Sequence, residues 1–204
     1  MSNTGDPEAD DLDDAMICVG FWRRVVAALV DAGIGIALQP LWLIVHRYCF
    51  EKRTVLPAMA LNAIVATAFL YMVVRHGATP GKFAIGARII DVSGRFLPWY
   101  RAVLRGAVGF VSSAAHYVHL HRVVNSAPPF SHVAGFKDLW RAEVQYGGHN
   151  YQLLSHVFSA FVVLDIFVIL TNPRRRAIHD FMAGSYVVTK DSWERFTKRG
   201  SGSS

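Results

Sequence analysis

The sequence contains none of the short motifs that mark the common hydrolases and nucleoside triphosphatases. It has no GxSxG nucleophile elbow, no HExxH helix and no Walker A phosphate loop. Charged residues are also scarce, at 18% of 204 residues, and there are only two cysteines. These absences leave no basis in the sequence for an enzymatic reaction, so we expect a protein that is not an enzyme.

The beginning of the sequence lacks the features of a cleavable signal peptide. Met1–Asp14 carries six acidic residues and has neither a basic start nor a small-residue cleavage site. Because this segment has few apolar side chains to bury, residues 1–16 are expected to form a disordered acidic tail. The first apolar run would then act as an uncleaved signal-anchor.

Long apolar runs are what the sequence does have, and hydrophobic residues make up 52% of it. Each run is close to the roughly 20 residues that a helix needs to cross a bilayer. The runs predict spans over residues 25–45, 55–74, 102–120 and 151–171. We therefore expect an all-α integral membrane protein with a four-transmembrane-helix bundle over residues 17–190 and a C-terminal tail over residues 191–204.

Two short segments have a different character. Arg88–Val92 (RIIDV) and Ser185–Thr189 (SYVVT) are rich in β-branched residues, which favours strands. We expect them to pair as a small β-hairpin-like element on the cytoplasmic side of the membrane. Between the third and fourth spans, residues 121–150 are too polar to span, and an amphipathic piece near Phe136–Val144 predicts a helix on the surface.

The distribution of basic residues predicts the orientation. With both termini cytoplasmic, the inner segments hold fifteen of the lysines and arginines and the outer loops hold six. This bias follows the positive-inside rule and places both termini in the cytoplasm. Cys18 and Cys49 then fall on opposite sides of the membrane, which excludes a disulfide between them within one chain.

Acidic residues inside two of the spans are the main candidates for function. Asp31 is the one charged residue of the first span, and Asp165 lies in the fourth at a similar expected depth from the cytoplasmic side. Arg24 lies seven residues before Asp31, on the same helix face, and Arg105 enters the third span from the same side. Because lipid offers no polar partners, we expect these four residues to form one polar cluster.

Two functions remain open for such a cluster. Two carboxylates in a medium of low dielectric constant repel each other, so one is expected to hold a proton that a monovalent cation can replace. This is the chemistry of a cation/proton antiporter, with Asp31 and Asp165 as the ion and proton ligands. The alternative is a structural ion pair, Asp31–Arg105 or Asp165–Arg105, that locks the helices together.

Three stretches of the sequence carry a family resemblance. They are RVVAALVD over Arg24–Asp31, ATPGK over Ala78–Lys82 with GARIID after it, and RRRAIHD over Arg174–Asp180 with AGSYVV after it. In this order they resemble the RDD family of small bacterial integral membrane proteins, named for one arginine and two aspartates. The resemblance implies a bacterial inner-membrane location.

The resemblance also assigns the family's named residues to Arg24, Asp31 and Asp180, with His179 and Lys82 inside the motifs. Transport, including cation/proton antiport, has been suggested for members of the family. From the residues themselves we expect Asp180 to accept hydrogen bonds from Arg24 or from the backbone amides of the turn over residues 79–81.

Histidines suggest a further alternative. His116, His119 and His121 cluster at the expected outer end of the third span, and the first two share a helix face at a spacing that can chelate a metal. A metal or haem on the outer face is one interpretation. The other is that these side chains bond to lipid headgroups or loop carbonyls at the interface, in which case no cofactor is needed.

The expected partners follow from the same patterns. The basic residues flank apolar runs, so we interpret them as topology determinants in contact with the lipid bilayer and not as contacts to nucleic acid. A transporter of this size would work as a homo-oligomer. The competing hypothesis is a non-catalytic subunit or assembly factor of a membrane complex that docks its partner through the outer loop, residues 121–150.

Overall fold

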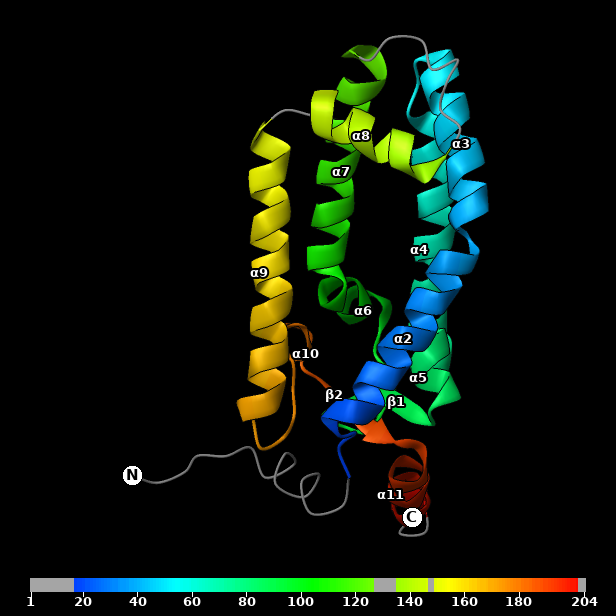
Figure 1. Ribbon diagram of the computed structural model, residues 1–204. Helices are drawn as coiled ribbons and strands as arrows, with labels where there is room; N and C mark the ends of the chain where they lie inside the picture. Colours follow the sequence, from blue (N-terminus) through cyan, green and yellow to red (C-terminus); the bar gives the residue numbers. More distant parts are fainter. Residues whose placement is uncertain (1–16, 127–134, 147–148, 202–204) are drawn as a thin grey trace. The chain divides into compact units, whose positions relative to one another are not determined.

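The computed structural model describes residues 17–126, 135–146 and 149–201, and helices dominate it (Figure 1). The helices are α2 (Phe21–Ala37), α3 (Gln39–Lys52), α4 (Leu56–His76), α5 (Pro80–Ala84), α6 (Trp99–Arg105), α7 (Ala107–Ser126), α8 (Phe136–Tyr146), α9 (His149–Thr171), α10 (Ile178–Met182) and α11 (Lys190–Ser201); the strands are β1 (Ala87–Asp91) and β2 (Ser185–Thr189). The predicted tail over residues 1–16 and two pieces of the predicted outer loop, 127–134 and 147–148, lie outside the described residues.

The apolar runs form helices, although the boundaries differ from the predicted spans. One segment, Leu56–Ala84, is long and apolar enough to cross a membrane, and the pair α2 and α3 passes the same test with a bend of 48°. Ser155–Thr171 of α9 is apolar but shorter. Among the described residues this gives one spanning helix, or two if the bent pair forms one span, which supports membrane character and leaves the number of spans open.

Two of the predicted spans are interrupted. The first breaks at Leu38, where Pro40 occupies the first turn of α3, a position in which the missing amide hydrogen of proline costs nothing. The third is divided between α6 and α7 at Gly106. Both α4 and α9 leave large apolar side chains uncovered, with Ile64 67% and Val163 66% exposed. Such surfaces are costly in water and suit contact with lipid.

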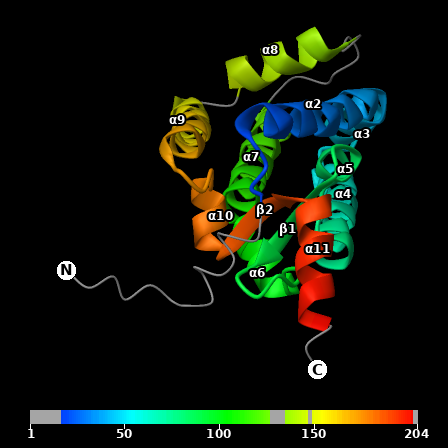
Figure 2. The same cartoon turned by 90° about the horizontal axis from the view of Figure 1, so that it is seen from below.

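The chain divides into two compact units. The first contains Met1–Ala32, Ala68–Gly106 and Leu164–Ser204. At its centre β1 pairs with β2 in antiparallel register, from Ala87 opposite Thr189 to Asp91 opposite Ser185, which confirms the predicted pairing. Ile89 and Val187 from the two strands are buried in the core of this unit. Helix α11 packs against both strands (Figure 2), so the predicted C-terminal tail contains a helix over most of its length.

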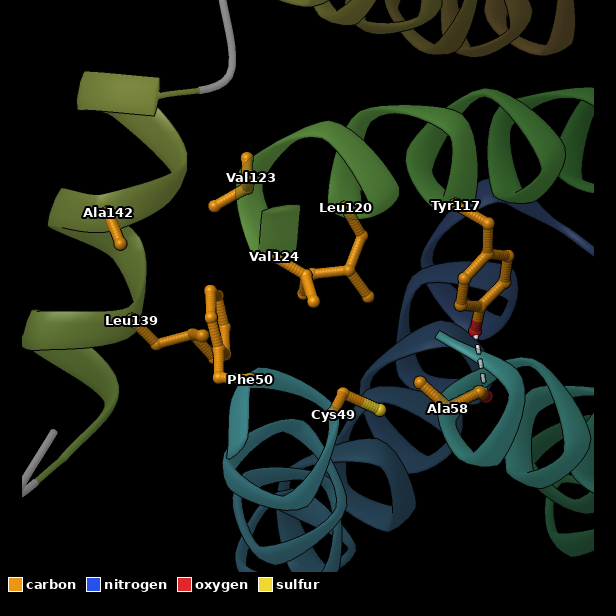
Figure 3. Packing of buried hydrophobic residues seen from close by; sticks show 9 residues of the cluster. All are labelled: Cys49, Phe50, Ala58, Tyr117, Leu120, Val123, Val124, Leu139 and Ala142. Atoms are coloured by element: carbon orange, nitrogen blue, oxygen red, sulfur yellow. Dashed lines mark hydrogen bonds between the residues drawn. The ribbon is translucent and has the colours of Figure 1, made fainter. Parts of the chain in front are cut away.

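The second unit contains Gly33–Thr67 and Ala107–Val163. Its core joins the ends of α3 and α7 to α8, and Figure 3 shows Leu139 of α8 beside Phe50 of α3. The Tyr117 hydroxyl donates a hydrogen bond of 3.2 Å to the carbonyl of Ala58. Helix α8 confirms the amphipathic helix predicted near residues 136–144.

Candidate functional site

The first unit gathers seven charged or titratable side chains that we call the charged cluster. They are Arg24, Asp31, Lys82, Arg105, Asp165, His179 and Asp180. Every candidate for an ion or proton site that the sequence suggested is therefore in this unit, together with the three other residues of the family motifs.

Asp180 is fully buried at the start of α10. One oxygen of its carboxylate accepts a hydrogen bond of 3.1 Å from the backbone amide of Ala177, the residue that precedes the helix. An acid in the first turn of a helix satisfies amides that have no partner within the helix. The local sequence therefore fixes the orientation of this carboxylate before any distant residue contacts it.

Two arginines from distant parts of the chain neutralise Asp180. Arg24 Nη1 donates to Oδ2 across 2.9 Å, which confirms the predicted Arg24–Asp180 contact, and Arg105 Nη2 donates to Oδ1. Burial favours the neutral acid, but Arg105, His179 and Arg24 outweigh it and hold the pKa of the Asp180 carboxyl well below its usual range. Asp180 therefore stays ionised and does not carry protons near neutrality.

The same two arginines have spare donors. Arg24 Nη2 and Arg105 Nη1 are buried and have no hydrogen-bond partner among the described residues. A guanidinium can only donate, so these atoms attract oxygen atoms and repel cations. A cation is not expected to bind on this side of the cluster.

His179 connects Asp180 to Asp165 of α9. Its Nδ1 lies 2.9 Å from Asp165 Oδ2, and its Nε2 lies 3.0 Å from Arg105 Nη2. Because a carboxylate accepts and a guanidinium donates, the neutral ring satisfies both contacts when its hydrogen is on Nδ1. The side chain of His179 is 29% exposed and that of Asp165 is 15% exposed, whereas Asp180 is 0% exposed. The Asp165–His179 pair is thus more exposed than Asp180.

Asp165 also accepts hydrogen bonds from backbone amides at the start of α10. Its Oδ1 accepts from the backbone amides of Ile178, at 2.8 Å, and of His179, at 3.4 Å. The carboxylate thereby joins α9 to the segment that carries Asp180. The predicted alternative of an Asp165–Arg105 ion pair is wrong, since Arg105 pairs with Asp180 and the ion-pair partner of Asp165 is His179.

Asp31 binds a turn. Oδ2 accepts from the Thr79 hydroxyl and Oδ1 from the Gly81 amide, each at 2.7 Å. Thr79 is the N-cap of α5, and its hydroxyl oxygen also accepts from the Lys82 amide. These amides were predicted to serve Asp180, and the predicted Asp31–Arg105 pair is replaced by this contact. The Thr-Pro-Gly sequence marks a helix start with free amides, but it gives no indication of which acid binds there.

Position 81 needs a glycine, because α5 approaches α2 so closely there that a side chain would not fit. A Cβ atom at this position would lie 2.0 Å from the carbonyl oxygen of Ala27 and 2.9 Å from Cγ of Asp31. Lys82, the next residue, interacts electrostatically with Arg105, Asp180, Asp31 and Arg24. Apart from His179, the cluster has three basic and three acidic side chains, so their formal charges balance.

The three histidines of the predicted metal site separate. His119 is buried, its ring centred 6.4 Å from that of His116, while His121 is exposed beside Asn125. His116 instead lies near His46 of α3 and Glu143 of α8. No local motif in the sequence indicates this grouping, because its three members come from three different helices.

Comparisons with known proteins identify the family of the chain. No curated protein and no solved structure matches the chain. The RDD family model matches residues 18–184, a range that includes every residue of the charged cluster. The match covers most of the chain and agrees with the three motifs noted in the sequence, so this membrane protein belongs to the RDD family.

Proposed function

We propose that the chain crosses the bacterial inner membrane four times, with both termini in the cytoplasm. The division into units supports this topology. The described residues 17–32, 68–106 and 164–201 belong to one compact unit, which includes the segment between the second and third predicted spans. Gly33–Thr67 and Ala107–Val163 form the other unit, which contains both predicted outer loops.

Within this topology we propose a small transporter that exchanges monovalent cations for protons. The observation that carries the proposal is the Asp165–His179 pair. Its 2.9 Å hydrogen bond joins two groups that can share a proton. Both side chains are more exposed than those of Arg24, Arg105 and Asp180. When His179 takes up a proton, its positive charge neutralises the Asp165 carboxylate. When that proton leaves, the uncompensated carboxylate can attract a monovalent cation in its place.

The other acids of the cluster have fixed roles in this proposal. Asp180 is held ionised by Arg24 and Arg105, and Asp31 is held by the Thr79–Gly81 turn. The donors to these two carboxylates are guanidinium, hydroxyl and backbone amide groups, which do not release their protons near neutrality. Oδ2 of Asp165, by contrast, is held by a histidine ring. The proton site therefore shifts from the Asp31 and Asp165 pair expected from the sequence to Asp165 with His179.

Exchange in sealed vesicles tests the proposal. A gradient of Na⁺ or K⁺ should drive a pH change in vesicles that contain the wild-type chain, and Asp165→Asn and His179→Gln should each abolish it. Asp191→Asn removes an exposed acid of the same unit and should exchange like the wild type. If the wild type moves no protons, or if Asp165→Asn exchanges as fast as Asp191→Asn, the proposal is wrong.

A non-catalytic scaffold is the second candidate, and the saturation of the acids favours it. Each of the three aspartates of the cluster accepts at least two hydrogen bonds, which is what a permanent fastening between helices requires. The partner would dock on the loop that contains α8, where Trp140 is 60% and Val144 49% exposed. Purification in mild detergent separates the two functions, since a stoichiometric second protein supports the scaffold and a homo-oligomer supports transport.

A further inference from the structure

A second group of titratable side chains lies in the unit that does not contain the charged cluster. His46 of α3, His116 of α7 and Glu143 of α8 each offer one ligand atom, and these three atoms lie within 4.8 Å of one another. His46 is buried and the other two are half-buried. Three metal-binding groups from three helices rarely converge by the packing of apolar faces alone, so the convergence needs an explanation.

The ring of His46 is oriented as a metal ligand is. Its Nδ1 lies 2.8 Å from the carbonyl oxygen of Trp42, one helical turn earlier. A carbonyl only accepts, so Nδ1 carries the hydrogen and Nε2 carries the lone pair. Histidines that bind metals almost always donate their other ring nitrogen to a carbonyl or a carboxylate in this way. The backbone of α3 thus selects the tautomer that can bind a metal.

Glu143 supplies the negative charge that such a site needs. Among the residues that the structure describes, no lysine or arginine forms an ion pair with this half-buried carboxylate. The nearest arginine along α8, Arg141, pairs with Asp138 instead. A buried carboxylate without a cation is unfavourable, and a bound metal ion would remove that cost.

The three helices are held together by a packed core next to these ligands. Tyr117 and Leu120 follow His116 on α7, and Leu139 and Ala142 precede Glu143 on α8; all four side chains are buried in one cluster with Phe50 (Figure 3). In a tetrahedral site with metal–ligand bonds of about 2.0–2.1 Å, the ligand atoms are about 3.3 Å apart. The three ligand atoms, which lie within 4.8 Å of one another, would come closer together when they bind an ion.

We propose that His46, His116 and Glu143 bind a divalent first-row transition metal ion, represented here by Zn²⁺. Two imidazoles and one carboxylate are a ligand set that zinc accepts, and they leave a fourth position for water or an exogenous ligand. The site is independent of the proposed ion exchange, because it shares no residue with the charged cluster. It also differs from the histidine group expected from the sequence, with which it has His116 alone in common.

Metal binding by the purified full chain, made without a histidine tag, tests the proposal. After chelator treatment, Zn²⁺ should bind with a stoichiometry of one per chain in competition with a chromophoric chelator. His46→Gln, His116→Gln and Glu143→Gln should each weaken binding at least about 100-fold, because the loss of outer-shell partners alone costs 10–100-fold. His121→Gln is the matched control: it removes an exposed histidine of the same helix and should bind Zn²⁺ like the wild type.

The visible absorption of bound Co²⁺ tests the proposal on the wild type, so the result does not depend on whether a variant folds. Co²⁺ bound to the wild type should show the intense visible absorption of a four- or five-coordinate ion, and added Zn²⁺ should abolish it. The proposal is overturned if Co²⁺ keeps the weak spectrum of its hydrated form. It is also overturned if the wild type binds Zn²⁺ no more tightly than the chain with all three ligands replaced, or if His121→Gln weakens binding as much as His46→Gln.

Discussion

Arg24 and Asp180 lie 156 positions apart in the sequence and form a buried salt bridge of 2.9 Å. The contact joins the first turns of α2 and α10, so it ties the N-terminal part of the first unit to its C-terminal part. Because Asp180 has no exposed surface, its charge depends on Arg24 and Arg105 for compensation. We therefore expect the Arg24–Asp180 salt bridge to be necessary for the stability of the first unit, independently of the function of that unit.

Removal of Arg24 should destabilise the protein strongly. Arg24→Met leaves Asp180 with Arg105 as its remaining arginine partner, and the loss of one partner from a buried ion pair typically costs about 3–5 kcal/mol. We expect a clear drop in the temperature of unfolding in detergent, followed by tryptophan fluorescence. Arg195→Met removes an exposed arginine of α11 and should leave that temperature nearly unchanged. Equal unfolding temperatures for Arg24→Met and the wild type would show that the salt bridge is not needed.

The depressed pKa of Asp180 predicts an acid-sensitive fold. A carboxyl whose pKa is lower in the folded state stabilises the protein above its unfolded pKa of about 4 and loses this contribution as the pH falls through the folded pKa. Below pH 4 the free energy of unfolding should therefore decrease by up to about 1.4 kcal/mol per pH unit. Asp180→Asn should be less stable at pH 7 and should lack this decrease, as measured by chemical unfolding at several pH values. Asp191→Asn should keep the wild-type decrease.

Gly81 should not tolerate a side chain. In Gly81→Ala the new methyl group would meet the Ala27 carbonyl at 2.0 Å and must push α5 away from α2, breaking the hydrogen bond from Gly81 to Asp31. Overpacking of this kind costs about 1–3 kcal/mol, and the lost hydrogen bond adds to it. Gly33→Ala, on α2 itself, places its methyl group where no atom from another part of the chain lies within 4 Å, and we expect little change or a small gain in stability. Thermal unfolding of the two variants side by side checks the difference.

Local patterns in the sequence were enough to predict part of this structure. The strands β1 and β2 could be predicted because β-branched residues fill both segments, and α8 could be predicted because its apolar residues follow a helical period. Four residues of the charged cluster could be named because a charge within or beside an apolar run needs a polar partner; they are Arg24, Asp31, Arg105 and Asp165. The other three, Lys82, His179 and Asp180, could be named because they lie in the motifs that resemble the RDD family.

The partners themselves could not be predicted, because they depend on packing between distant segments. Asp31 and Asp165 were expected to share one site, yet Asp31 binds the Thr79–Gly81 turn and Asp165 binds His179. The close approach of α5 to α2, which Gly81 permits, decides the first pairing. The grouping of His46 and Glu143 with His116 could not be predicted for the same reason, since each is a single residue on its own helix and belongs to no local motif.

The topology can be tested by the accessibility of single cysteines. In a chain without Cys18 and Cys49, we would introduce Arg95→Cys, Arg195→Cys or Arg47→Cys, three exposed positions. Arg95 and Arg195 belong to one compact unit and should behave alike, whereas Arg47 belongs to the other. If the first unit is cytoplasmic, a membrane-impermeant maleimide should label Arg47→Cys in intact spheroplasts and the other two variants only after lysis. The fifteen basic residues expected on the inner side favour this orientation. Labelling of Arg95→Cys and Arg47→Cys from the same face would contradict the proposed topology.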